Sequence, residues 1–249
     1  MPARFFAPAT YTSGDLVTLS HDESQHLTRV LRLGEGAAVR IFNGRGDEFE
    51  SIVESVGRDG VALRVGAARA AAPEPRLRMN LVQSVLKGDK MDDVIRDVVM
   101  MGVASVQPVV TTRTEVGLGA LEKAHRRERW QRIAVSAAKQ CGRAAVPDIQ
   151  EARAFGYVMK ALADSRDSAP VMLLVEPGAG PSVMTLADLE IEPPQAVTVV
   201  IGPEGGWTPE EIAEAADTCR LVTLGGRTLR ADAMALVAIS ALFAKWGEL

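Results

Sequence analysis

Ile201-Gly-Pro-Glu-Gly-Gly206-Trp-Thr-Pro-Glu-Glu211 is one of two glycine-rich segments that decide the fold, and the other is Leu224-Gly-Gly-Arg227-Thr-Leu-Arg230-Ala-Asp232. Each segment follows a short apolar or β-branched run and precedes a helical pattern. Because glycine has no Cβ, backbone N–H and C=O groups can come close to a ligand there. Ligands bind where strands end in open α/β sheets, so we expect the two loops to form one bipartite cofactor site.

The chain after residue 75 alternates between strand and helix patterns. Strands are predicted at 78–85, 103–110, 171–175, 197–201 and 221–224, and helices at 91–101, 121–141, 155–162 and 232–246. A further helix is predicted to begin at Thr208, where Pro209 and Glu211 complete a capping box, and Gly102 is expected to end the first helix. The alternation predicts an α/β fold with a mostly parallel sheet covered on both sides.

The first 70 residues have a β pattern instead. Short runs at 16–19, 37–42, 48–54 and 61–65 are separated by turn residues, and Asn43-Gly44 predicts a hairpin. This spacing favours a small barrel. A short helix is predicted at 26–33 with Leu27, Val30 and Leu31 on one face. The linker 67–75 then divides the chain into expected domains at 1–72 and 73–249.

Composition excludes several classes of protein. The sequence has 249 residues, of which 47% are hydrophobic, and its longest apolar stretch, 233–244, is too short to span a bilayer. No secretory signal pattern is present at the N-terminus. Two distant cysteines, Cys141 and Cys219, indicate a reducing compartment, so we expect a cytoplasmic location without membrane attachment. Three histidines without ligand spacing indicate that no metal is bound.

The charge is unevenly distributed along the chain. The net charge is −4 overall, −1 for residues 1–72, +4 for 73–153 and −7 for 154–249. The segment from Lys123 to Arg143 contains seven basic residues. They form either a solvated helix face or a positive face that attracts phosphates.

The predicted final helix is apolar nearly all round, with Met234, Leu236, Val237, Ile239 and Leu242 on different sides. Such a helix must be buried on most sides, either by the rest of the monomer or by a partner subunit.

Common nucleotide and hydrolase motifs are missing from the sequence: there is no G-x-G-x-x-G after a strand, no P-loop and no G-x-S-x-G. Loops rich in backbone groups and poor in charge suit an adenine ring and an amino-acid tail better than a triphosphate.

The two glycine loops resemble the cofactor signature of the SPOUT methyltransferases, and most closely that of the RsmE family of 16S ribosomal RNA uridine N3-methyltransferases. Further motifs of that family match along the whole chain: Arg4-Phe5-Phe6, His26-Leu-x-Arg29-Val-Leu-Arg32, Asn43-Gly-x-Gly46, Lys87-Gly-Asp-Lys-Met91, Arg113, Arg129-Trp130 and Gln140-Cys-Gly-Arg143 with Pro147. The chain departs from the family pattern at Gly226, at Asp232-Ala233 and at 97–102, which leaves details of the active-site rim open.

The resemblance implies a small N-terminal PUA-like β-barrel followed by a SPOUT-type α/β domain with a deep trefoil knot. It also implies an S-adenosylmethionine pocket inside the knot, a homodimer, and 16S ribosomal RNA or the small ribosomal subunit as the partner. The predicted reaction is methylation of uridine N3. Two alternatives stay open: a non-catalytic RNA-binding ribosome assembly factor, and a SPOUT enzyme that methylates a ribose 2′-hydroxyl on transfer RNA.

Site residues follow from the positions that match the family motifs. Expected cofactor contacts are Ile201, Gly202, Pro203, Gly205, Gly206, Leu224, Gly225, Leu229 and Arg230. Expected catalytic residues are Arg227, Arg230, Asp232 and Glu204, and expected RNA contacts are Arg4, Arg29, Arg32, Arg113 and Arg143. Glu204 either balances the sulfonium charge or neighbours the base, or is a surface turn residue, and Asp232 is either the proton acceptor or a helix N-cap.

Overall fold

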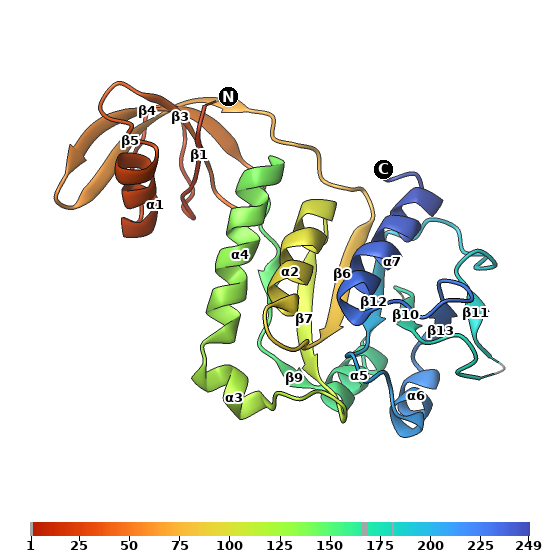
Figure 1. Cartoon of the computed structure of the whole chain (residues 1–249). Coiled ribbons are helices and arrows are strands. Elements are labelled where there is room, and N and C mark those ends of the chain that lie inside the picture. The colour runs from red at the N-terminus through yellow and green to blue at the C-terminus, as the bar shows by residue number, and fades with distance from the viewer. Residues whose placement is uncertain (1, 166–168, 181) are drawn as a thin grey trace. The chain divides into compact units, whose positions relative to one another are not determined.

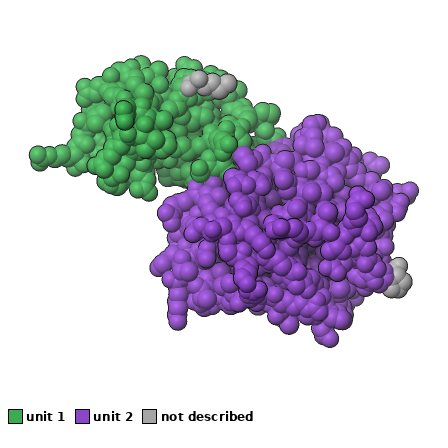
Figure 2. Space-filling view, viewed as in Figure 1, with its two compact units in different colours: residues 1–74, 135–146 green, residues 75–134, 147–249 purple. Residues whose placement is uncertain are grey.

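The computed structural model describes residues 2–165, 169–180 and 182–249. The chain forms two compact units, one made of residues 1–74 and 135–146 and the other of residues 75–134 and 147–249 (Figure 2). Residues 135–146 therefore cluster with the N-terminal unit, although they lie within the sequence range expected for the second domain. The domain boundary predicted between residues 72 and 73 stays a prediction.

The N-terminal unit contains a five-stranded sheet in the order β1-β3-β4-β5-β2. Its strands are β1 (Arg4–Phe6), β2 (Leu16–Thr18), β3 (Ala38–Phe42), β4 (Glu48–Gly57) and β5 (Gly60–Arg69). The predicted hairpin is confirmed, because β3 and β4 pair antiparallel and the Asn43 side chain accepts hydrogen bonds from the backbone of Arg45 and Asp47. Strand β1, which pairs parallel to β3, was not among the predicted strands.

The helical segment before β3 differs from its prediction. Helix α1 (His21–Gln25) begins after the N-cap Ser20 and continues as a π-helical turn, η1 (His26–Val30). Leu27 is buried, whereas Val30 is 66% and Leu31 40% exposed, so the predicted shared apolar face of these three residues is wrong. The physical reason is the wider π turn, which changes the angular spacing of successive side chains.

Arg4 lies at the centre of a buried polar network in this unit. Its guanidinium donates to both carboxylate oxygens of Glu48, at 3.3 and 2.8 Å, and to four backbone carbonyls in residues 138–143. Glu48 is only 3% exposed, and Arg40 approaches it no closer than 3.9 Å. The network ties β1 and β4 to the end of helix α4 (Arg126–Cys141), whose last carbonyls would otherwise lack partners.

Replacing Arg4 should therefore destabilise the protein. We expect Arg4→Met to lower the free energy of unfolding by about 3 kcal/mol, because a buried carboxylate loses its main partner. Urea denaturation followed by circular dichroism measures the change. The control is Arg64→Met, which removes the exposed ion pair with Glu54 in the same sheet and should leave the unfolding midpoint nearly unchanged. Equal effects of the two substitutions would contradict the assignment.

The C-terminal unit contains a parallel sheet in the order β11-β13-β10-β12-β6-β7-β8, with β9 also paired to β7. The strands are β6 (Arg78–Ser84), β7 (Ser105–Val110), β8 (Asp148–Ile149), β9 (Arg153–Ala154), β10 (Val171–Leu174), β11 (Met184–Thr185), β12 (Ala196–Ile201) and β13 (Arg220–Thr223). All pairs in this sheet are parallel. The predicted α/β fold with a parallel sheet is confirmed.

Helices cover this sheet. They are α2 (Lys90–Met101), α3 (Leu118–Lys123), the first part of α4, α5 (Phe155–Ala163), α6 (Pro209–Ala216) and α7 (Ala231–Lys245). Helices α2 and α7 lie side by side, and α7 packs on β6 and β12 (Figure 1). Helix α5 packs against α6 and β7. In the described parts of the chain, no helix is long and apolar enough to cross a bilayer.

Two predicted helix boundaries are confirmed. Thr208 and Glu211 form the reciprocal capping box of α6, with Pro209 in the first turn, and Gly102 ends α2 with a φ of 107°. The single helix predicted at 121–141 is wrong. His125, with a φ of 47°, breaks it into α3 and α4, because this left-handed backbone conformation cannot continue a right-handed helix.

Helix α7 is covered mainly from within its unit. Ala235, Ala238, Ile239, Leu242 and Phe243 are buried. Val237 remains 41% exposed. One side of this apolar helix therefore lies open in the single chain.

Candidate functional site

A cavity of about 340 Å³ lies at the carboxyl ends of β10, β12 and β13, entirely within the C-terminal unit. The loops after β12 and β13, which carry the two glycine-rich segments, form facing parts of its wall, and the start of α7 completes it. Strand β10 pairs in parallel with both β12 and β13, so the three carboxyl ends meet at one edge of the sheet. The two glycine loops thus form one site.

Ten of the twelve predicted cofactor-binding and catalytic residues line the cavity: Ile201, Gly202, Pro203, Glu204, Gly206, Leu224, Arg227, Leu229, Arg230 and Asp232. Gly205 and Gly225 are not among the lining residues. The carbonyl of Gly205 instead accepts a hydrogen bond of 2.7 Å from Arg113, and that of Gly225 accepts one from the Thr223 hydroxyl. Both carbonyls are thus engaged within the protein rather than free to contact a ligand.

The first loop requires glycine at Gly206. Its backbone N–H donates to the carbonyl of Pro203 at 3.0 Å, which closes a tight turn, and its φ is 68°. Side chains rarely adopt this left-handed conformation. The turn leaves the loop backbone facing the cavity.

Trp207 forms an apolar wall of the cavity next to Gly202. Its indole N–H donates to the carbonyl of Leu174 at 2.8 Å, and its ring lies 4.9 Å from that of Phe155. A Cβ at Gly202 would lie 3.0 Å from the indole. A flat wall beside bare backbone fits a planar heterocycle, and the volume falls in the range of small-molecule sites.

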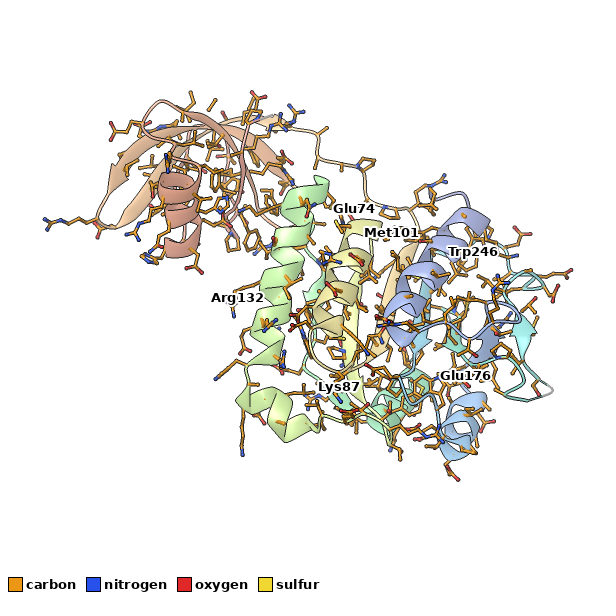
Figure 3. The ribbon with its side chains drawn as sticks, viewed as in Figure 1. Glu74, Lys87, Met101, Arg132, Glu176 and Trp246 are labelled. Atoms are coloured by element: carbon orange, nitrogen blue, oxygen red, sulfur yellow. The ribbon has the colours of Figure 1, made fainter. Side chains whose placement is uncertain are left out.

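Sequence reasoning assigned no role to several lining residues. They are Lys90, Leu174, Val175, Glu176, Pro177, Trp207, Thr223, Thr228, Ala231 and Met234. Trp207 lies within the first glycine-rich segment, so the sequence does indicate that it is close to the cofactor site. Glu176 follows β10, and Lys90 begins α2 after β6, so only the strand order brings them to the cavity. Figure 3 labels Glu176.

Lys90 and Glu204 form an ion pair at the rim of the cavity. The Lys90 ammonium donates to Glu204 Oε1 at 2.8 Å, and the backbone N–H of Lys87 donates to the same oxygen at 3.2 Å. Burial opposes ionisation of Glu204, but these hydrogen bonds outweigh it and hold the pKa of the carboxyl below its ordinary value. Glu204 is therefore an anion at neutral pH and a weak base.

Arg230 and Asp232 form a second ion pair beside the first. Two guanidinium nitrogens of Arg230 donate to the two Asp232 oxygens at 3.0 and 2.8 Å, which lowers the pKa of that carboxyl. The prediction of Asp232 as an N-cap is wrong. Helix α7 begins at Ala231, one residue earlier than expected, so Arg230 occupies the cap position and Asp232 the first turn.

The predicted RNA contacts fall into two groups. Arg29, Arg32 and Arg113 are exposed, and Arg113 also holds the first glycine loop through Gly205. Arg4 and Arg143, by contrast, are bound inside the N-terminal unit: Arg143 is 5% exposed and donates to the Glu74 carboxylate. For these two, the hydrogen bonds indicate a structural role, and contact with RNA stays an untested prediction.

The basic run on α4 is largely neutralised by acidic neighbours. Arg129 pairs with Asp89 and Asp92, and Arg127 lies within 3.6 Å of carboxylates of Asp148 and Glu151. Arg132 is exposed and Arg126 is half-buried, and neither forms an ion pair among the described residues. These two cations, rather than the whole run, can attract phosphates.

Within the described ranges, no group of three or more His, Cys, Asp or Glu side chains is arranged to hold a metal ion.

The chain is similar to two families of domains. The RNA methyltransferase domain matches residues 73–243, and the RNA methyltransferase PUA domain matches residues 19–66. The ribosomal RNA small subunit methyltransferase E of Synechocystis is 30% identical, with 90% of this chain and 71% of the relative covered. That of Bacillus subtilis is 26% identical, with 90% and 88% covered.

Two similar solved structures contain S-adenosylmethionine. A putative methyltransferase from Legionella pneumophila has a TM-score of 0.88 and 30% identity, covering 99% of this chain and 98% of that one. A ribosomal RNA small subunit methyltransferase E from Neisseria gonorrhoeae has a TM-score of 0.87 and 29% identity, with the same coverage.

Packing at the cavity wall gives a testable expectation. Gly202→Ala should lower the free energy of unfolding by about 1 kcal/mol, because the new methyl group crowds an indole held by its hydrogen bond. Gly226→Ala, in the second loop with open space around it and no left-handed φ, should cost nothing. Urea denaturation of the two variants compares them. Equal stability would show that the indole shifts freely.

Proposed function

Since the chain belongs to the ribosomal RNA small subunit methyltransferase E family of RNA methyltransferases, we propose that it transfers a methyl group from S-adenosylmethionine to N3 of a uridine in 16S ribosomal RNA. The family membership predicted from the sequence is confirmed, and with it the classification as a methyltransferase. The observation that carries the proposal is the single cavity that joins the two glycine loops.

The residues present fit this cofactor. Backbone groups at Gly202, Leu224 and Leu229, with the Trp207 wall, suit the adenine ring, and the carboxylates of Glu176 and Glu204 suit ribose hydroxyls and a positively charged sulfonium. When bound, S-adenosylmethionine supplies an electrophilic methyl group. The protein must then place a uracil nitrogen in line with it, and orientation of this kind can contribute up to about 7–11 kcal/mol.

Uridine N3 carries a proton at neutral pH, so the site must favour its loss. Cations near the O2 and O4 oxygens stabilise the anion that forms. Arg227 and Arg230 line the cavity and can act in this way. Asp232 is a weak base because of its ion pair, so we assign it to orienting Arg230, and the proton leaves to solvent.

The proposal extends to the domain architecture and the oligomeric state. We propose that residues 1–72 form a PUA-like barrel that binds RNA through Arg29 and Arg32, and that residues 73–249 form the SPOUT domain with its trefoil knot. The exposed side of α7, including Val237, supports a homodimer that covers it. A cytoplasmic location is proposed from the ribosomal substrate.

The two alternative functions have less support. A non-catalytic assembly factor has no need of a cavity lined by bare backbone, and the cavity is formed by both cofactor loops. A ribose 2′-hydroxyl methyltransferase acting on transfer RNA does not explain the match of residues 19–66 to a PUA domain of RNA methyltransferases.

Nucleoside analysis tests the proposed reaction. We expect small ribosomal subunits from a strain lacking this protein to gain one 3-methyluridine per 16S RNA when the purified protein and S-adenosylmethionine are added. Mass spectrometry of digested RNA identifies the product. Appearance of a 2′-O-methylated nucleoside supports the second alternative, whereas no methylation together with no cofactor binding in calorimetry supports the first.

Arg230 should contribute to turnover without supporting the fold. We expect Arg230→Ala to reduce turnover about tenfold or more, because a cation near the uracil oxygens is lost, and to leave the thermal midpoint nearly unchanged, since the side chain is 74% exposed. The matched control is Arg220→Ala at the opposite end of β13, also exposed. Wild-type turnover in the Arg230 variant would remove its proposed role.

A further inference from the structure

Lys90 is a cation on the cavity wall that neither glycine loop supplies. It is the first residue of α2, so the backbone there ends the loop after β6 and begins the helix. Strand β6 pairs with β12, which brings this helix start beside the first glycine loop. The ammonium reaches Glu204 in that loop at 2.8 Å.

The geometry leaves part of the ammonium available to a ligand. A lysine ammonium has three N–H donors. In the described parts of the chain, Glu204 is the one hydrogen-bond acceptor of Lys90, so two donors remain. The side chain is 35% exposed and lines the cavity, and its ion pair with Glu204 fixes its position.

The other cations of the site are held differently. Arg230 directs two guanidinium nitrogens at Asp232 and is 74% exposed. Arg227 is exposed and also borders a second hollow lined by residues 224–227, Leu229 and Val237, so its position is less restricted. Lys90 combines a fixed position, partial burial and free donors.

We propose that Lys90 is a catalytic residue of the reaction proposed above, on which this inference rests: its ammonium donates to a uracil carbonyl oxygen and stabilises the N3 anion. Glu204 is its positioning residue, because its carboxylate accepts one ammonium N–H and the Lys87 N–H together. In this assignment Glu204 orients the Lys90 ammonium and does not act as a base.

The step that Lys90 assists is ionisation of the base. The N3–H bond breaks, its electron pair stays on the uracil ring and is shared with O2 and O4, and the proton goes to water. A cation at one of these oxygens lowers the pKa of bound uridine. The ionised fraction at neutral pH then rises, and with it the rate.

The charges that face Lys90 come from several elements. Besides Glu204, the charged groups that line the cavity with Lys90 are Arg230 and Asp232 at the start of α7, Arg227 and Glu176. The carboxylates at the start of α2 are paired elsewhere: Asp89 and Asp92 with Arg129, and Asp93 with Arg96. Glu204 and Asp232 both have lowered pKa values, so they stay ionised throughout the range in which uridine titrates. A change of rate with pH near and above neutrality therefore reports the substrate.

The test compares pH–rate profiles for small ribosomal subunits from a strain lacking the protein. We expect Lys90→Met to reduce turnover about 10- to 100-fold at pH 7 and to move the rise of rate with pH upward by about one unit, so that the deficit shrinks in alkaline buffer. Lys90→Arg, which keeps the charge, should recover a large part of the rate. Calorimetry should show unchanged affinity of Lys90→Met for S-adenosylmethionine, and co-sedimentation should show unchanged binding to the subunit.

The control is Lys160→Met. Lys160 is exposed on α5 and does not line the cavity, so wild-type turnover and pH profile are expected. An unshifted profile for Lys90→Met, or loss of cofactor affinity in both Lys90 variants, would overturn the inference. Absence of methylation by the wild-type protein would instead overturn the proposed function.

Discussion

The parallel pairing of β10 with β12 on one edge and β13 on the other holds the candidate site together. Leu173 lies beside Val200 and Leu221, so the three strands run in register and end at one level. The loops that follow them come from chain segments about 25–50 residues apart. Their backbone groups can surround a ligand only because these strands are neighbours, and a shift of either pairing would separate the two glycine loops.

Local sequence signals predicted the elements that depend on local physics. Thr208, Pro209 and Glu211 specify a helix start through a few hydrogen bonds, and Gly102 specifies a helix end through one backbone conformation. The glycine loops were predictable for the same reason. The break at His125 was not, because the residues around it have ordinary helical patterning and nothing local requires a left-handed residue there.

Long-range contacts explain what the sequence could not predict. Lys90 lies in the motif Lys87-Gly-Asp-Lys-Met91, but only the strand order brings it and Glu176 to the cavity. Arg4 and Arg143 look like surface cations in the sequence, yet each meets an acidic partner that lies 44 or 69 residues away and becomes structural. Much of the positive charge of the basic run on α4 is likewise neutralised by ion pairs with Asp89, Asp92, Asp148 and Glu151. Charge counts along the chain therefore overstate the positive surface.

The indole of Trp207 gives this protein an intrinsic optical reporter. It is one of three tryptophans, and the other two, Trp130 and Trp246, are buried away from the cavity lining. An aromatic ring that enters the cavity stacks near Trp207 alone, so its emission changes while the background from the other two stays constant. Occupancy of the site can therefore be followed by fluorescence without a label.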